Sequence, residues 1–238
     1  MHVYWLEQTE SDVPTNDEFF SETELLRLKS FVIPKRRSDW RLGRWTAKCA
    51  VAWYLQLPFR PEVLARIEIR PAASGAPEVF LEERPLKLPI SISHRAGRSL
   101  CTVANGDVAL GCDLELVEPH SAAFVADYFT EHEQQFIAAA PAPSRMRLVA
   151  LFWSAKESVL KALHEGLRID TRSLAVEDEA DSGDINGWSR LRIHNGSGLV
   201  FHGWWQQSGG FVRTIAAAWP LDCPVQLKSA PHYWSACA

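Results

Sequence analysis

Two acidic side chains stand two positions apart directly after an apolar run. The sequence V-A-L-G-C-D-L-E occupies residues 108–115. Successive side chains of a β-strand alternate between its faces, so a strand here points Asp113 and Glu115 to the same side. Neighbouring carboxylates repel unless a cation lies between them, and Mg²⁺ prefers carboxylate, water and phosphate oxygens. The pair therefore indicates a phosphate-handling metal site, with a solvent-facing strand end as the alternative.

A second group of polar residues lies in the run F-W-S-A-K-E-S-V-L-K at residues 152–161. On a helix, Trp153, Glu157 and Lys161 fall on one side, at the edge of an apolar stripe. A carboxylate in that place needs a cation or hydrogen-bond donors, so Glu157 is a candidate functional acid. The alternative is an exposed Glu157–Lys161 ion pair, which contributes only ~0.3–0.5 kcal/mol.

A third group can hold a phosphate. The run S-I-S-H-R-A-G at residues 91–97 leaves an expected strand and enters a loop. Ser93, His94 and Arg95 bring a hydroxyl, an imidazole and a guanidinium together, and such groups bind phosphate oxygens. His94 is also a candidate proton carrier. A polar loop with one surface histidine is the alternative.

A basic stripe is the fourth feature. Arg37, Arg41, Arg44 and Lys48 are spaced four, three and four positions apart, so they share one face of an expected helix. A solvated basic face is the usual explanation of such a stripe. The net charge of the chain is −4, however, so this local concentration of positive charge favours a polyanionic ligand.

The composition bounds the class of protein. The chain has 238 residues, of which 47% are hydrophobic, enough for a core in one large or two small domains. Its net charge of −4 argues against bulk nucleic-acid binding, and no apolar run approaches the ~20 residues that span a bilayer. The start of the chain lacks a signal-peptide pattern. Its five cysteines are scattered and form no C-x-x-C pair, which favours a reducing cytoplasm and argues against zinc.

The elements that position these residues repeat in order. A helix capped by Ser21 and a helix over 39–57, ended by Pro58, precede four expected strands, and Asn105-Gly106 predicts a hairpin between the last two. Helices and then strands follow again, with Gly166 expected to cap the longest helix. The sequence therefore predicts an α+β fold with two similar halves, residues 1–115 and 116–238. The expected strands are 66–70, 88–93, 99–104, 108–115, 173–177, 190–194, 199–206 and 211–219, and the later helices are 122–129, 131–139 and 145–165.

Three of these runs, in this order, resemble the Sfp-type 4′-phosphopantetheinyl transferases. The family's Ser-His motif matches I-S-H at 92–94, its G-[IV]-D-[IVL]-E motif matches residues 111–115, and its W-S-x-K-E-[SA]-x-x-K motif matches 153–161. The L-G-R at 42–44 is similar to the family's basic helix. The resemblance spans roughly residues 36–169, and the combination of motifs is specific.

The resemblance implies a pseudo-twofold monomer with its active site in the cleft between two halves. It implies that coenzyme A donates its 4′-phosphopantetheine arm to a serine of an acyl- or peptidyl-carrier protein of fatty acid, polyketide or nonribosomal peptide biosynthesis. Adenosine 3′,5′-bisphosphate is then the second product. The first half is expected to bind coenzyme A through its basic helix and Ser-His motif, and the second half contributes the W-S-x-K-E helix.

The resemblance also implies roles for single residues. Asp113, Glu115 and Glu157 would bind Mg²⁺, or Mn²⁺, while Glu157 or a water on the metal would act as the base. Lys161 would offset the developing charge. The remaining residues would contact phosphates of coenzyme A: Ser93, His94, Arg95, Arg37, Arg41, Arg44 and Lys48.

One departure bears on activity. Many relatives have a lysine between glycine and proline shortly before the Ser-His motif, whereas this chain has G-A-P at residues 75–77. Arg95 is a candidate replacement for that charge. A module that binds coenzyme A or a carrier without turnover is therefore an alternative function, and an Mg²⁺-dependent phosphohydrolase is a third.

Overall fold

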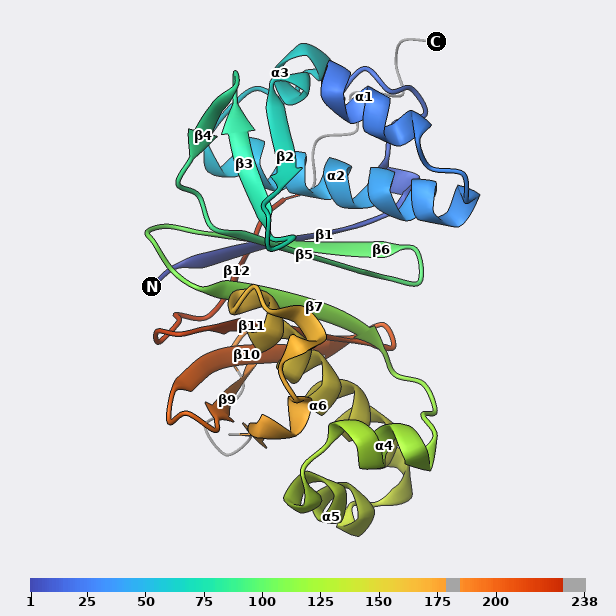
Figure 1. Cartoon of the computed structure of the whole chain (residues 1–238), viewed down its shortest axis with the longest axis vertical. Helices are drawn as coiled ribbons and strands as arrows, with labels where there is room; N and C mark the ends of the chain where they lie inside the picture. Colours follow the sequence, from blue (N-terminus) through green and yellow to red (C-terminus); the bar gives the residue numbers. More distant parts are fainter. Residues whose placement is uncertain (179–184, 229–238) are drawn as a thin grey trace. The chain divides into compact units, whose positions relative to one another are not determined.

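The computed structural model describes residues 1–178 and 185–228. These residues form helices and largely antiparallel sheets, so the predicted α+β class is confirmed (Figure 1). They divide into two compact units. The C-terminal unit contains Val108–Pro224 together with Met1–Val3, and the N-terminal unit contains Tyr4–Asp107 together with the described residues from Val225. Within the described ranges, no helix combines the length and apolar character that a membrane span requires.

The N-terminal unit packs three α-helices against two sheets. A four-stranded sheet has the order β12-β1-β6-β5, and a three-stranded sheet has the order β2-β3-β4. The longest helix, α2, packs on β6, β5 and β2. The elements are β1 (Val3–Thr9), α1 (Glu22–Lys29), α2 (Pro34–Tyr54), α3 (Pro61–Ala65), β2 (Ile67–Pro71), β3 (Pro77–Leu81), β4 (Arg84–Leu86), β5 (Ile90–Arg95), β6 (Arg98–Ala104) and β12 (Val225–Gln226).

The C-terminal unit builds one five-stranded antiparallel sheet in the order β7-β11-β10-β9-β8. Its longest helix, α6, packs against β7 and β11, and apolar residues of α6 and the sheet form the core. The elements are β7 (Leu110–Leu116), α4 (Ala122–Tyr128), α5 (Glu131–Ala139), α6 (Ala142–Ala162), β8 (Leu174–Asp178), β9 (Ser189–Asn195), β10 (Val200–Ser208) and β11 (Phe211–Ala217).

The helix starts follow local rules. Ser21 caps α1 as predicted: its hydroxyl accepts from the Glu24 backbone N–H, and the Glu24 carboxylate accepts from the Ser21 N–H. The same reciprocal bonds join Thr130 and Glu133 at the start of α5. The helix predicted to start at Asp39 instead starts at Pro34, because proline is well accommodated at the first helical position.

Two local predictions are wrong. Asn105-Gly106 does not join a hairpin: β6 pairs with β1 and β5, whereas β7 pairs with β11 of the other unit's sheet. The hairpin lies one connection earlier, between β5 and β6, where Ala96 and Gly97 both have positive φ. Gly166 does not cap α6 either. The helix ends at Ala162 with Leu163 as its C-cap, and His164 takes the left-handed conformation.

The position of β7 decides which residues share a unit. β7 belongs to the C-terminal unit, whereas the predicted boundary after residue 115 assigned it to the first half. Asp113 and Glu115 therefore lie in the same unit as Glu157 and Lys161. Residues 178–187, whose acidic and polar sequence predicts a loop, lie largely outside the described residues.

Candidate active site

A glycine lets α6 lie directly on β7. A Cβ atom on Gly111 would stand 1.8 Å from the Ser158 carbonyl oxygen and 2.8 Å from the Ala162 nitrogen, so only a residue without a side chain fits there. Side chains alternate along a strand, so Asp113 and Glu115 point toward the same helix as Gly111. The intervening Cys112 and Leu114 are buried. The G-x-D-x-E pattern thus combines a close helix contact with two carboxylates.

Asp113 lies opposite two charged residues of α6. Lys161 Nζ donates to Asp113 Oδ1 at 2.7 Å and to the Cys112 carbonyl oxygen at 3.1 Å. Burial raises the pKa of Glu157, and the negative charge of Asp113 raises it further, while Lys161 opposes both effects. Burial lowers the pKa of Lys161, but its interactions with Asp113 and Glu157 outweigh that effect, so the pKa lies above its ordinary value. Two carboxylates and one ammonium therefore act on one another here.

Glu115 contacts a different part of α6. Trp153 Nε1 donates to Glu115 Oε1 at 3.2 Å. The indole ring packs against Phe124 and Tyr128 of α4, with ring centroids 5.1 and 5.0 Å away. Trp153 thus links the second carboxylate of β7 to an aromatic cluster.

Buried hydroxyl groups hold α6 against β11. Ser158 Oγ and Ser154 Oγ lie 2.6 and 2.8 Å from Thr214 Oγ1, and Thr214 Oγ1 also donates to the Ser154 carbonyl oxygen at 2.8 Å. All three side chains are fully buried. Thr214 lies directly opposite Asp113 in the pairing of β11 with β7. The two serines of the W-S-x-K-E-S run therefore fix the helix that carries Glu157 and Lys161, a role that sequence reasoning missed.

The lysine of this run makes a buried ion pair. Lys156 Nζ lies 2.7 Å from Glu133 Oε2 and donates to the carbonyl oxygens of Tyr128 and Thr171, both at 3.0 Å. Glu133 Oε1 accepts from the Val176 N–H of β8 at 2.9 Å. Lys156 and Glu133 are almost completely buried. The pair therefore joins α5, α6 and β8 beneath the candidate site.

The N-terminal unit contains an equivalent buried lysine–glutamate ion pair. Lys48 Nζ lies 2.5 Å from Glu24 Oε2 and donates to the carbonyl oxygens of Phe19 and Leu64 at 2.8 and 3.0 Å. Glu24 Oε1 accepts from the Ile69 N–H of β2 at 3.3 Å. Lys48 is fully buried, so its ammonium lies in the core and is absent from the surface on which Arg37 lies. Helical spacing alone placed it in the basic stripe.

A short internal repeat explains the two ion pairs. Residues 45–50 read W-T-A-K-C-A and residues 153–158 read W-S-A-K-E-S, each on the longest helix of its unit. A capping box supplies the glutamate in both units. Cys49 stands where the second copy has Glu157, and its thiol is fully buried. The repeat therefore supports the predicted similarity of the halves, and only the second copy carries the acid.

The predicted coenzyme A residues differ in their surroundings. Arg37 is exposed, whereas Arg41 donates to Asp17 Oδ1 at 3.0 Å and to two backbone carbonyl oxygens. Arg44 lies over the Trp40 ring, 5.0 Å from its centroid, and its buried Nε finds no hydrogen-bond partner among the described residues. Burial lowers the pKa of Arg44. Arg44 thus has a buried donor available for a ligand.

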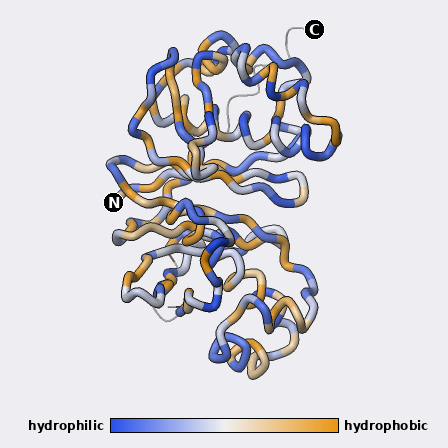
Figure 2. The backbone as a smooth tube through the Cα atoms, viewed as in Figure 1, coloured by the Kyte–Doolittle hydropathy of each residue, from blue (hydrophilic) through white to orange (hydrophobic). Residues whose placement is uncertain are grey.

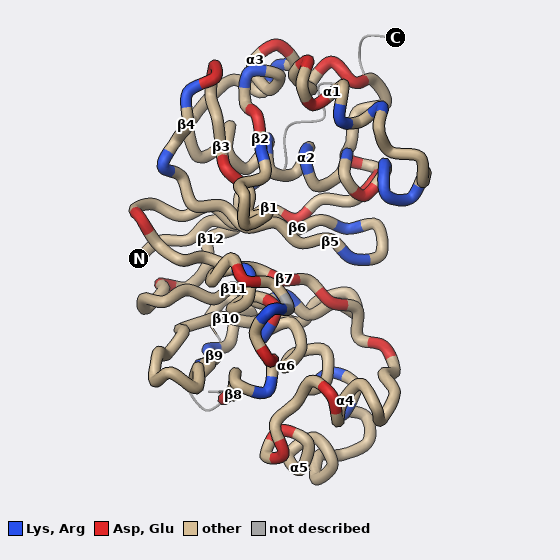
Figure 3. The backbone as a smooth tube through the Cα atoms, viewed as in Figure 1, with Lys and Arg blue, Asp and Glu red and all other residues tan. Residues whose placement is uncertain are grey.

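The Ser-His motif lies on β5 of the same unit. Ser93 is buried, Arg95 is half-buried, and the exposed His94 imidazole lies 4.0 Å from Asp39 Oδ2 of α2. Lys35 shares that carboxylate. Lysine and arginine residues gather at the start of α2 (Figure 3). The turn that joins α1 to α2 next to them is apolar (Figure 2).

Asp113, Glu115 and Glu157 are the candidate metal ligands of the C-terminal unit. Among the described residues, no three His, Cys, Asp or Glu side chains are gathered as a ready metal site. Lys161 provides the positive charge next to Asp113 instead. The donors are all hard oxygens, however, and the repulsion from Asp113 that raises the pKa of Glu157 is what a bound cation would relieve. The donor chemistry therefore fits Mg²⁺.

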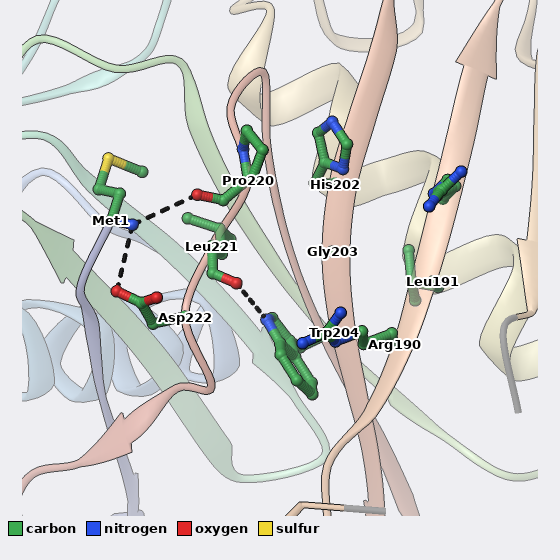
Figure 4. Close-up of a pocket in the computed structure, with 10 residues that line it drawn as sticks. Met1, Arg190, Leu191, His202, Gly203, Trp204, Pro220, Leu221 and Asp222 are labelled. Carbon is green, nitrogen blue, oxygen red and sulfur yellow. Dashed lines mark hydrogen bonds and ion pairs between the residues drawn. The ribbon is translucent and has the colours of Figure 1, made fainter. Parts of the chain in front are cut away.

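A separate pocket of about 300 Å³ lies against β9 and β10 of the C-terminal unit (Figure 4). Trp204 Nε1 donates to the Leu221 carbonyl oxygen at 3.0 Å, and Asp222 lies 3.2 Å from the Met1 amino group. None of the predicted site residues lines it. Its lining residues are Met1, Arg190, Leu191, Arg192, His202, Gly203, Trp204, Pro220, Leu221 and Asp222.

Known proteins resemble the chain over the segment that carries this site. Residues 109–201 match the model of the 4′-phosphopantetheinyl transferase superfamily. The chain is 25% identical over 193 residues to the 4′-phosphopantetheinyl transferase HetI of Nostoc sp., a match that covers 79% of each protein. The crystal structure of holo-[acyl-carrier-protein] synthase from Thermotoga maritima is 20% identical, with a TM-score of 0.36. That match covers 46% of this chain and 62% of that structure.

The segment that the family model matches includes β7 and α6 with their acidic residues, and the proteins that resemble it are group-transfer enzymes. The chain is similar to members of the 4′-phosphopantetheinyl transferase superfamily. The resemblance predicted from the three sequence motifs is confirmed.

Proposed function

We propose that the chain moves the 4′-phosphopantetheine arm of coenzyme A to a serine hydroxyl of an acyl- or peptidyl-carrier protein. The serine oxygen forms a bond to the β-phosphorus of the diphosphate, the bond from that phosphorus to the bridging oxygen breaks, and adenosine 3′,5′-bisphosphate leaves. The observation that supports this most is the cluster of Asp113, Glu157 and Lys161 on β7 and α6, inside the matched segment.

Asp113, Glu115 and Glu157 are the proposed ligands of Mg²⁺, with Mn²⁺ as a substitute. The ion would neutralise negative charge on the diphosphate oxygens and polarise the phosphorus under attack. Catalysis of such a transfer consists mainly of positioning and charge neutralisation. Lys161 already holds an ammonium next to Asp113, so it can neutralise charge that develops on the phosphoryl oxygens.

Glu157 is the proposed base toward the serine hydroxyl. A general base is most effective when its pKa lies near the working pH. Burial and the charge of Asp113 raise the pKa of Glu157, whereas a bound cation would lower it, so a water on the metal is the alternative base. The carboxylate would accept the serine proton as the oxygen attacks.

Coenzyme A is proposed to bind to the N-terminal unit through Arg37, Arg44, Ser93, His94 and Arg95. The buried Nε of Arg44 supports this proposal, because a buried donor without a partner is costly and a phosphate oxygen would satisfy it. Lys48 is left out, since Glu24 and two carbonyl oxygens already surround its ammonium. Arg41 is a weaker candidate, because three acceptors occupy its guanidinium.

The enzyme is proposed to act in the cytoplasm as a monomer. The four cysteines that the structure describes are free thiols, three of them buried, which suits a reducing compartment.

The test is incubation with coenzyme A, Mg²⁺ and a panel of fatty-acid, polyketide and peptide-synthase apo-carriers, followed by intact-mass measurement. One added phosphopantetheine arm on a carrier is the expected result. Binding of coenzyme A by calorimetry without any mass change would instead favour a binding module. Release of pantetheine phosphate without a carrier would favour a phosphohydrolase.

A further inference from the structure

The side chain of Glu115 is held by α6. Glu115 is half-buried near the end of β7, and its Oε1 accepts from Trp153 Nε1 at 3.2 Å. A glutamate has three side-chain torsions, and fixing them costs conformational entropy. The indole N–H of Trp153 restricts these torsions before a ligand binds, so less conformational entropy is lost on binding.

The indole itself is fixed by rings of the preceding helix. Phe124 and Tyr128 of α4 meet the Trp153 ring edge-on, at interplanar angles of 68° and 64°. The two α4 rings also contact each other, with centroids 5.0 Å apart. Such edge-to-face contacts are directional, so they set the direction in which the indole N–H points.

We propose that Trp153 is a positioning residue that orients Glu115 for the divalent cation. This inference rests on the proposed function, in which Glu115 is a metal ligand. The indole N–H donates to Oε1 and so fixes the direction in which the carboxylate group faces. Ligating carboxylates are commonly hydrogen-bonded by such outer partners, and loss of the partner typically weakens metal affinity about 10–100-fold.

The variant Trp153→Phe tests this, because it keeps an aromatic ring in the cluster and removes the N–H. Mg²⁺ is titrated calorimetrically into the full-length protein that has been preincubated with coenzyme A, with coenzyme A alone as the blank. We expect the Kd for Mg²⁺ to rise at least about 10-fold. The Mg²⁺ concentration for half-maximal transfer should rise in parallel, while kcat at saturating Mg²⁺ stays near that of the wild type.

Trp204→Phe is the matched control. It removes an indole hydrogen bond of 3.0 Å from Trp204, a tryptophan on β10 of the same unit. Its Kd for Mg²⁺ should equal that of the wild type. An unchanged Kd in Trp153→Phe, or an equal rise in both variants, would overturn the positioning role alone. Absence of Mg²⁺ binding in the wild type would instead overturn the proposed metal site on which the inference rests.

Discussion

Replacing Gly111 by alanine tests the contact between β7 and α6. The new Cβ would stand 1.8 Å from the Ser158 carbonyl oxygen, whereas ordinary contacts begin at 3.4 Å, so helix and strand must separate by about 3.4 − 1.8 = 1.6 Å. The same shift would lengthen the 2.7 Å bond between Lys161 and Asp113 to about 4.3 Å, beyond hydrogen-bonding distance. Overpacking of this kind typically costs about 1–3 kcal/mol of folding free energy.

Thermal unfolding and carrier modification measure the two effects. A cost of about 1–3 kcal/mol lowers the Tm by roughly 2–12 °C in a protein of this size. We expect transfer to fall strongly even at temperatures where the variant stays folded, because the lysine and the carboxylate have separated.

Gly43→Ala is the control for this experiment. A Cβ there would lie 3.8 Å from its nearest neighbour, inside α2, where alanine is favoured over glycine by about 1 kcal/mol. This variant should keep or raise the Tm. A Gly111→Ala protein with the Tm and turnover of the wild type would refute the assignment of Gly111 as the residue that admits α6.

Two further changes test the charges around the site. Lys156→Met leaves Glu133 buried without its cation, so denaturant unfolding should show a loss of about 3–5 kcal/mol, and a loss below about 1 kcal/mol would contradict the pair's role. Burial and the charge of Asp113 raise the pKa of Glu157 above 4.5. The Glu157 carboxylate therefore destabilises the folded state as the pH rises through its folded-state pKa, and Glu157→Gln removes this effect. The Gln variant should therefore have a higher Tm than the wild type at pH 7, and this difference should vanish below about pH 4.5. A lower Tm of the variant at pH 7 would contradict the raised pKa of Glu157.

Local signals predicted much of the fold. The Ser21 capping box marked the start of α1, and the helix expected over 131–139 has the bounds of α5. The turn signal at Asn105-Gly106 misled, because turn chemistry is local and strand pairing is decided by tertiary packing. The three motifs were enough to indicate the family, because they combine several residue types in a fixed order.

The surroundings of single charges could not be predicted in the same way. Helical spacing assigned Lys48 to the surface, since nothing in that spacing reveals that Glu24 meets it from another helix. The repeated W-[TS]-A-K run was the available signal, because it relates Lys48 to Lys156. The roles of Thr214 and Glu133 depend on contacts between segments that are distant in the sequence. The residues next to them in the sequence form no comparable pattern.

The central claim is that the acidic cluster of β7 and α6 carries out phosphopantetheine transfer. Intact-mass measurement of an apo-carrier, incubated with coenzyme A and Mg²⁺ and either the wild type or a folded Asp113→Ala variant, tests it most directly. The account predicts one added arm with the wild type and none with the variant. Equal modification of the carrier by the two proteins would contradict it.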